Sequence, residues 1–409
     1  MSETTVGGSS VRGAAPASIV FSRGVLRGGV AVLVILALIA GAYALHDTAG
    51  YGAKASLSLM LGAALGITFA RGRFCFFCIL RDWIEHRDST GMYAILAALA
   101  VGGIGYALVF GAFLPNAFSG RLPPDAHIGP VSWVLLAAGG AFGLGMALSG
   151  ACISGHLYRL GEGYTRAPFA LAGSALGFGL GFFTWQSVYL GTLRAAPVAW
   201  LPATLGYGGS LALHLAVLVI IGIFLLRALP VKGAQPEERL TLGGIFERVF
   251  RRRWNPLVTG AIVGVLGVFA YFRIEPLGVT SQIASFSRTT LANAGLLADR
   301  LNGLDTFAGC AAQVVQAITE NGWLIGGLVL GSFAVSLIAN RFQLSSLSLK
   351  SAATALGGGV LMGWGAMLAL GCTVGTLLSG ISAFALSGWV FAAAVIGGVW
   401  LGLRLKLHE

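Results

Sequence analysis

Cysteines are the side chains of this sequence best suited to chemistry. Cys75 and Cys78 lie within the stretch GRFCFFCIL (72–80), whereas Cys152 and Cys372 each stand alone in a glycine-rich apolar stretch. Thiols exchange disulfides, bind metal ions or touch a soft solute, and each use needs different neighbours. The neighbours of these cysteines therefore have to distinguish a redox pair, a metal site and a path for a sulphur-containing species.

A metal site has the least support of the three. Structural zinc requires four ligands, and Cys75 and Cys78 supply only two. The other two would have to come from Cys152, Cys310 and Cys372, which have no histidine beside them at ligand spacing. His156, four residues after Cys152, is expected to be an interfacial or loop residue. We therefore expect neither a metal nor a cofactor.

A redox pair is the alternative hypothesis. Cys-x-x-Cys is the spacing of exchange-active dithiols, in which one thiol has a lowered pKa. Arg71 and Arg73 precede Cys75 and would favour its thiolate. A membrane-embedded thiol–disulfide oxidoreductase built on Cys75 and Cys78 would nevertheless leave Cys152 and Cys372 without a role.

Contact with a solute uses more of the cysteines. A thiol with a pKa of about 8.5 is mostly neutral S–H near pH 7, and it is a weak hydrogen-bond donor. It can touch a sulphur anion without charge repulsion, unlike a carboxylate. The competing interpretation, that each cysteine is simply a small buried hydrophobe, applies most to Cys78 and Cys310.

The composition places these thiols in a membrane protein. Of 409 residues, 56% are hydrophobic and only 10% are charged, against about 25% charged in soluble domains. The mean hydropathy is +0.84. The net charge of +11 fits Lys and Arg gathered in cytoplasmic loops. The basic stretch 227–253 carries no nucleic-acid motif. We therefore expect the protein to lie in a lipid bilayer and not to bind nucleic acid.

The apolar runs predict an all-α polytopic fold with about ten transmembrane helices, each of roughly 20 residues. The expected spans are 26–45, 55–70, 91–113, 131–150, 167–186, 210–227, 255–272, 323–340, 352–370 and 384–403. Basic residues before the first span predict a cytoplasmic N-terminus, and alternation then places the C-terminus there too. Apart from Arg27 and Arg227, which lie at the ends of their spans, no Lys or Arg falls inside these spans. The ends of helices would therefore have to attract an anion.

An internal repeat relates the two halves of the chain. An ungapped shift of 220 residues places Cys152 on Cys372. The same shift superimposes Gly139, Gly143, Gly145, Gly155 and Gly177 on Gly359, Gly363, Gly365, Gly375 and Gly397. With a different offset, GRFC (72–75) aligns with GVTS (278–281), which puts Ser281 in place of Cys75. Corresponding points face opposite sides of the membrane in the expected topology, so the repeats are inverted, as in many transporters.

Broken helices are expected wherever these repeats carry their polar residues. Irregular backbone at membrane depth must be buried in protein or line a wet cavity. Ser154 and Thr373 are expected to cap helices that start inside the membrane, whose positive ends would attract an anion. The expected path residues are Cys75, Cys152, Ser154, Gly155, Ser281, Gly371, Cys372, Thr373 and Gly375. Most glycines of 139–145 and 357–365 are expected to allow close helix packing.

The sequence resembles the YeeE/YedE family of membrane sulphur transporters. The resemblance rests on GRFCFFCILRD (72–82), LSGACISGHLYRLGEG (148–163), EPLGVTSQI (275–283) and LALGCTVGTLLSGISAFALSGWVF (368–391). It implies a bacterial inner-membrane protein whose pseudo-symmetric halves are pinched into an hourglass, with half-helices meeting at the centre. It also implies inward transport of thiosulfate or a related sulphur species. The family's three transport cysteines would fall on Cys75, Cys152 and Cys372.

These expectations divide the chain into five parts. They are a cytoplasmic N-terminus with the first span (1–54), repeat 1 (55–188), an outer loop with a linking span (189–227), a basic cytoplasmic linker (228–254) and repeat 2 (255–405). A cytosolic sulphur-carrier protein at the inner face is a further hypothesis, and the roles of Cys78 and Cys310 are left open.

Overall fold

A computed structural model describes the chain apart from residues 1–16, 230–246, 299, 305–313, 315–316 and 408–409. Cys310 and most of the expected linker therefore lie outside the described residues. Within the described ranges the regular elements are helices, and ten segments are long and apolar enough to cross a membrane. These ten overlap the ten expected spans, which confirms the all-α polytopic prediction.

The helices alternate between long spans and short pieces. Their bounds are α1 (Ala17–Asp47), α2 (Gly52–Gly72), α3 (Phe76–His86), α4 (Met92–Phe113), α5 (Trp133–Ser149), α6 (Ile153–Glu162), α7 (Ala167–Gly191), η1 (Leu193–Ala195), α8 (Pro202–Leu226), η2 (Glu247–Arg251), α10 (Pro256–Arg273), α11 (Ser281–Asn293), α12 (Glu320–Ile338), α13 (Leu349–Leu368), η4 (Thr373–Ser379), α14 (Gly380–Ser382) and α15 (Leu386–Arg404). The turns before α3, α6 and η4 are short, so each of these pieces continues an apolar span after a break.

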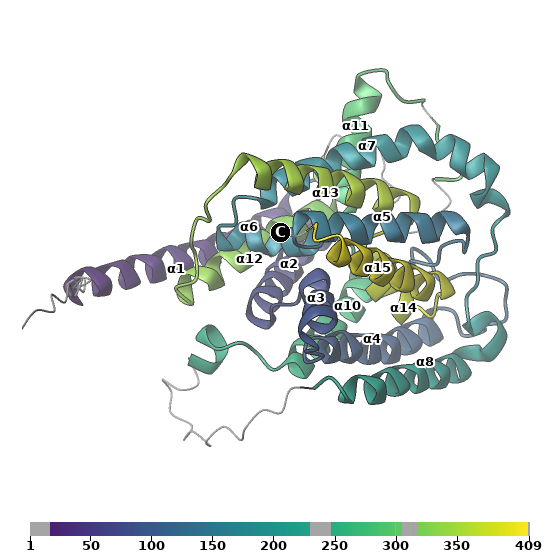
Figure 1. Ribbon diagram of the computed structural model, residues 1–409, viewed down its shortest axis with the longest axis horizontal. Helices are drawn as coiled ribbons and strands as arrows, with labels where there is room; N and C mark the ends of the chain where they lie inside the picture. The colour runs from purple at the N-terminus through teal and green to yellow at the C-terminus, as the bar shows by residue number, and fades with distance from the viewer. Residues whose placement is uncertain (1–16, 230–246, 299, 305–313, 315–316, 408–409) are drawn as a thin grey trace, which may run out of the picture.

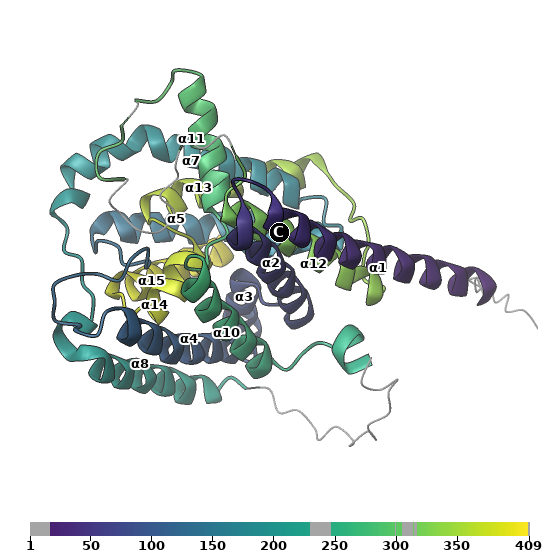
Figure 2. The ribbon, with the colours of Figure 1, turned by 180° about the vertical axis from the view of Figure 1, so that it is seen from behind.

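Helices from distant parts of the sequence pack as partners. The extensively packed pairs are α2 with α12, α4 with α10, α5 with α15, and α7 with α13, while α5 also packs on α13. The layer of α5, α7 and α13 is visible in Figure 1 and from behind in Figure 2. In both views α1 projects from the rest, and it contacts α2 and α12.

Glycines allow the partner helices to approach closely. A Cβ atom at Gly143 would overlap the Val395 carbonyl oxygen, and one at Gly359 would overlap the Ala170 carbonyl oxygen. Small residues at such crossings are the usual means of tight packing in membranes. Gly140 has open space instead, and Gly357 meets only a leucine methyl group at 3.7 Å. The packing prediction for residues 139–145 and 357–365 is thus confirmed for most of their glycines.

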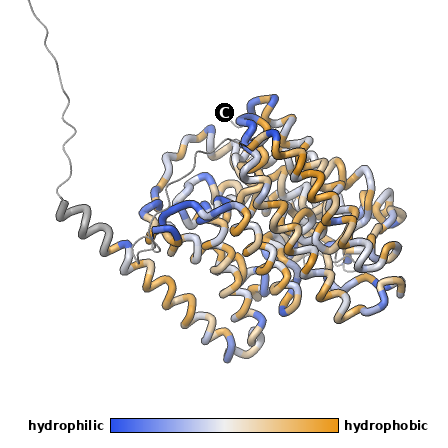
Figure 3. The backbone as a smooth tube through the Cα atoms, turned by 90° about the horizontal axis from the view of Figure 1, so that it is seen from below, coloured by the Kyte–Doolittle hydropathy of each residue, from blue (hydrophilic) through white to orange (hydrophobic). Residues whose placement is uncertain are grey.

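Apolar side chains face outward over much of the molecule. Figure 3 shows hydrophobic colour along most of the helices and hydrophilic colour mainly in connecting segments. On α8, Ile220, Ile223 and Phe224 are each more than half exposed. Such a surface is suited to lipid, because exposing so much apolar area to water is unfavourable.

Candidate functional site

The three cysteines singled out in the sequence all lie at the start of a short buried helix. Cys75 precedes α3, Cys152 precedes α6 and Cys372 precedes η4, and each has extended backbone at the N-cap position. At most 1% of any of them is exposed. Three helix N-termini, whose first N–H groups lack partners within the helix, therefore lie next to sulphur atoms inside the protein.

The prediction that Ser154 and Thr373 cap these helices is wrong. The N-cap residues are Cys152 and Cys372, because α6 begins two residues and η4 one residue earlier than expected. The thiol of Cys152 itself accepts from the Gly155 N–H at 3.3 Å. Ser154 Oγ instead lies 3.2 Å from Cys152 Sγ, so this hydroxyl contacts the thiol and not the helix end.

The first two of these helix starts meet at a pair of thiols. Cys75 Sγ and Cys152 Sγ are 3.8 Å apart, and the four described cysteines are all free. A Cβ atom at Gly155 would lie 2.7 Å from Cys75 Sγ and 3.3 Å from Cys152 Sγ. A side chain at Gly155 would push into the thiol pair, so glycine is what lets α6 begin against Cys75.

The third helix start has different neighbours. No sulphur–sulphur contact joins Cys372 to another cysteine in the described part of the chain. Gly371 packs against Thr376, and a Cβ atom at Gly375 would lie 2.9 Å from the Cε1 atom of His127. Thr373 is the first residue of η4, a π-helix. The structure therefore divides the expected path residues into two clusters, although all three cysteines belong to one buried core.

His127 is a residue that the sequence reasoning missed. It lies in the 114–132 connection between α4 and α5, is 6% exposed, and its Nδ1 atom has no hydrogen-bond partner among the described residues. Burial lowers the pKa of His127 to about 4. Its imidazole is therefore neutral beside η4 at physiological pH.

Ser281 does not join either cluster through a hydrogen bond among the described residues. It is the first residue of α11, whose N-cap is the buried Thr280. Asn321 holds this break together: its side chain donates to the Gly278 carbonyl oxygen and accepts from the Gln282 N–H at 3.3 Å. The spacing of residues in the sequence did not indicate that the buried Asn321 amide would hydrogen-bond this irregular backbone.

Arginines lie closer to the thiols than the apolar runs suggested. Arg71 is only 1% exposed and donates to the Arg252 carbonyl oxygen. Arg159 lies on α6, which continues the fourth span, Trp133–Glu162. The expectation that helix ends alone would supply positive charge is thus wrong, because the predicted span stopped at residue 150. His156 also lies on α6 and is buried, which corrects its expected interfacial or loop position.

A small polar cavity lies between α3 and α6, beyond the thiol pair. Its volume is about 140 Å³. It is lined by Arg73, Cys78, Ile79, Arg81, Asp82, Asp88, Thr90, Gly91, Tyr158, Arg159, Glu162, Tyr164 and Arg253. Cys78, whose role the sequence left open, therefore faces a charged cavity and is not a purely apolar core residue. In the described ranges no group of three His, Cys, Asp or Glu side chains gathers to hold a metal ion.

Comparison with known proteins agrees with this geometry. A family described as sulphur transport matches residues 71–401, which include all three cysteine-bearing helix starts. The chain belongs to this sulphur transport family. A protein named thiosulfate transporter TsuA from Escherichia coli is 27% identical over 84% of this chain and 92% of its own length. A TsuA from Spirochaeta thermophila is 29% identical over 84% of this chain and 96% of its own length.

A shorter match covers a probable transporter named YedE from Salmonella typhimurium, which is 39% identical over 21% of this chain and 22% of its own length. The family and these relatives carry the names of transporters and not of enzymes. The chain is therefore a multi-pass membrane protein of a transporter family, which disfavours the oxidoreductase hypothesis for Cys75 and Cys78.

Proposed function

We propose that this protein imports thiosulfate or a related sulphur-containing anion across the bacterial inner membrane. The observation that carries the proposal is the contact between Cys75 and Cys152 at the meeting point of two buried helix starts. Neutral thiols and free backbone N–H groups attract an anion without holding it as a fixed cation would. Weak, successive contacts are what a conducting path needs. The names of the two long relatives support thiosulfate as the substrate.

The proposed route begins at the cluster around Cys372, with Ser281 in the outer vestibule. The anion then passes the thiol pair, where Cys152 and Cys75 exchange S–H contacts with it, and leaves on the side of Cys75. Gly371, Thr373 and Gly375 line the first part of this route. Ser154 and Gly155 line the narrow part.

The proposed route runs between two inverted repeats, 55–188 and 255–405, with both termini in the cytoplasm. Helix partnering supports the repeat: if α2 corresponds to α10 and α4 to α12, the pair α2–α12 has its counterpart in α10–α4. Likewise α5–α15 has its counterpart in α13–α7. The first span (26–45) and the 228–254 linker would be additions to this hourglass.

Uptake of labelled thiosulfate into proteoliposomes tests the proposal. We expect uptake by the wild type, loss of uptake in Cys75→Ala, Cys152→Ala and Cys372→Ala, and retention in Cys78→Ala. Silent Cys152→Ala and Cys372→Ala variants with an inactive Cys78→Ala variant would instead indicate the thiol–disulfide oxidoreductase. Competition by sulfite, selenium oxyanions and polysulfide would rank the anions.

A cytosolic sulphur-carrier protein at the inner face belongs to the same proposal, since an anion delivered inward has to be consumed. Protease access to tags at the two termini in spheroplasts tests the cytoplasmic orientation. A terminus cleaved from outside would reverse the direction of the route.

A further inference from the structure

Arg159 connects the thiol pair to the small polar cavity. It lies two turns along α6 from Cys152, and its Nη2 atom donates to Cys78 Sγ at 2.9 Å. Cys78 in turn lies one turn along α3 from Cys75. The two helices that start at the touching thiols are therefore bridged a second time by a guanidinium and a thiol. The cavity opens at this second contact.

The positive charge of Arg159 is not cancelled by an ion pair. Its Nη1 atom donates to the Gly150 carbonyl oxygen at 3.1 Å, and its guanidinium lies 5.3 Å from the Tyr164 ring centroid. Among the described residues no carboxylate forms an ion pair with it, and Asp82 is paired with Arg81 at 2.8 Å. The direct contacts of this half-buried guanidinium are thus with neutral groups, so its N–H groups are not committed to a carboxylate.

The remaining wall of the cavity keeps this charge available. Besides the paired Arg81 and Asp82, the wall carries Arg73 and Arg253 as positive groups and Asp88 and Glu162 as negative groups. Neither of these two carboxylates forms an ion pair with Arg159 in the described ranges. With Arg159, the positive groups of the wall outnumber the negative ones by one. A volume of about 140 Å³ exceeds the roughly 30 Å³ share of one water molecule several times. It is large enough for a small tetrahedral anion, which a guanidinium can bind through two parallel N–H groups.

The repeat shows that this arrangement occurs on one side only. The shift that places Cys152 on Cys372 places Arg159 on Ser379. The Ser379 hydroxyl donates to the Leu277 carbonyl oxygen at 2.9 Å, so it satisfies the backbone of a break. The fold therefore does not require an arginine at this position of the repeat.

We infer that the cavity between α3 and α6 is a second anion site, in which Arg159 holds the sulphur oxyanion after it passes Cys75. This inference rests on the proposed transport function. Cys78 lies at the site as a neighbour of Arg159, and the charge needed to hold the anion comes from the guanidinium. An anion here would separate Arg159 from Cys78 and shield that thiol.

Thiol labelling provides a binding readout that does not depend on transport. The purified protein in detergent is treated with a maleimide with or without sodium thiosulfate, and modification of Cys78 is measured by mass spectrometry. We expect thiosulfate to slow Cys78 labelling in the wild type and to leave it unchanged in Arg159→Gln, with Arg159→Lys between them. Loss of one charged hydrogen bond of 1.5–3 kcal/mol corresponds to roughly 10–150-fold weaker protection.

Uptake into proteoliposomes is the second readout. Arg159→Gln should lose most uptake, while the exposed control Arg404→Gln should retain it. A folded Arg159→Gln variant with wild-type uptake and intact Cys78 protection would overturn the inference. If that variant does not fold, absence of thiosulfate protection in the wild type overturns it. Wild-type uptake without protection defeats the second site alone, whereas protection without uptake defeats the transport proposal alone.

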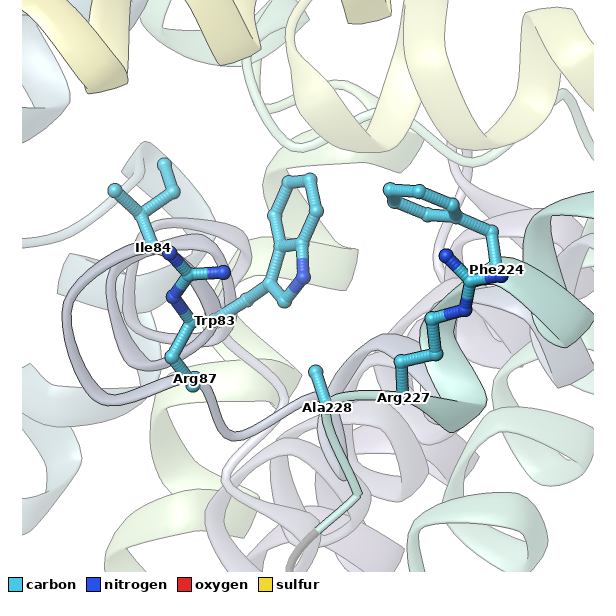
Figure 4. Close-up of a pocket in the computed structure, with 6 residues that line it drawn as sticks. All are labelled: Trp83, Ile84, Arg87, Phe224, Arg227 and Ala228. Atoms are coloured by element: carbon cyan, nitrogen blue, oxygen red, sulfur yellow. The ribbon is translucent and has the colours of Figure 1, made fainter.

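A separate cavity at the lipid-facing surface carries an independent inference. It has a volume of about 520 Å³ and is lined by Trp83, Ile84, Arg87, Phe224, Arg227 and Ala228. Figure 4 shows the guanidinium groups of Arg87 and Arg227 on opposite sides of the Trp83 ring. Neither arginine has an ion pair or hydrogen bond among the described residues. The wall continues into the exposed apolar face of α8, on which Phe224 is 62% exposed.

We propose that this cavity binds the headgroup of an anionic phospholipid. Two guanidinium groups without an ion pair among the described residues complement a phosphate, and the apolar wall fits the start of the acyl chains. The walls are fixed relative to each other, because the Ser89 N–H donates to the Ala228 carbonyl oxygen at 3.0 Å and Ser89 Oγ donates to the Leu225 carbonyl oxygen at 2.9 Å. The end of α8 is thus anchored to the turn between α3 and α4.

Thermal unfolding in detergent tests the lipid site. Added phosphatidylglycerol should raise the Tm of the wild type more than phosphatidylcholine does, and the double variant Arg87→Gln/Arg227→Gln should lose that difference. The control Arg121→Gln/Arg194→Gln, at exposed arginines elsewhere, should keep it. Inorganic phosphate should give no shift. An equal phosphatidylglycerol shift in the Arg87/Arg227 variant, or saturation by phosphate, would overturn the proposal.

Discussion

The helix starts at Cys152 and Cys372 are aligned by the 220-residue shift of the sequence but have different chemistry. Cys152 caps a regular α-helix with its own thiol and touches a second thiol. Cys372 precedes a π-helix, has no side-chain cap, and packs in the region of a buried histidine. Two segments that align in sequence therefore need not form two equivalent sites.

The difference follows from what each break has to satisfy. On the Cys152 side, an arginine two turns into α6 reaches back to the Gly150 carbonyl oxygen. On the Cys372 side, Thr376 Oγ1 donates to the Ala369 carbonyl oxygen at 3.3 Å. Both backbone carbonyl groups accept a hydrogen bond, from a cationic side chain at Gly150 and from a neutral one at Ala369. A gradient from neutral to positive along the route would favour anion movement toward the Cys75 side.

The largest expected effect comes from adding a methyl group at each helix start. Gly155→Ala would put a carbon between the two thiols, whereas Gly375→Ala would press on the edge of the His127 ring. Overpacking costs about 1–3 kcal/mol, or roughly 5–150-fold in an equilibrium. We expect Gly155→Ala to reduce thiosulfate uptake toward the upper value and Gly375→Ala toward the lower. Equal losses would show that the two starts are functionally alike.

Glycines at helix crossings should respond alike to substitution, in contrast to the glycines at the two helix starts. A Cβ atom at Gly145 would lie 2.5 Å from the Gly358 carbonyl oxygen, and one at Gly365 would lie 2.5 Å from the Ala138 carbonyl oxygen. Gly145→Ala and Gly365→Ala should each destabilise the protein by about 1–3 kcal/mol, measured as a lower Tm in detergent. Gly140→Ala, where nothing lies within 4 Å, is the matched control. A drop in the control as large as in the other two would rule out the packing explanation.

A smaller effect is expected at the Ser154 hydroxyl beside the Cys152 thiol. Ser154→Ala removes the group 3.2 Å from Cys152 Sγ, and the repeat has Val374 at the equivalent position. One such hydrogen bond contributes about 1 kcal/mol, or roughly fivefold. We expect uptake to fall by about that factor, with unchanged Tm. Val374→Ala serves as the control on the other start, and a larger loss there would invert the comparison.

The smallest effect concerns pH and the helix start at Cys372. Burial lowers the pKa of His127 to about 4, so the folded protein binds fewer protons here than the unfolded chain between about pH 4 and 6.5. Stability should therefore fall as the pH decreases through that window, and His127 should add no slope above it. Thermal unfolding of His127→Gln should show a shallower acid dependence than the wild type. Identical curves would mean that His127 titrates normally.

The membrane spans and the breaks within them could be predicted, because both depend on local sequence. Apolar run length fixed the ten spans, since the bilayer sets how many residues must be hydrophobic. The breaks at Cys75, Cys152 and Cys372 were predicted because glycine and polar residues interrupt those runs. The caps were misassigned because a shift of one residue in the turn changes which side chain faces the helix end. Arg159 was missed because a short amphipathic helix after a break does not look like a membrane span.

The sequence by itself determined the solvent, the number of crossings and the positions of the interruptions, because hydropathy and glycine content act along the chain. Only the tertiary structure decided that Cys75 meets Cys152, that Arg159 reaches Cys78, and that His127 lies beside η4. The physical reason is that these contacts join segments separated by a loop or by whole helices. Their partners are selected by how closely helices pack, and periodicity along one segment carries no information about that.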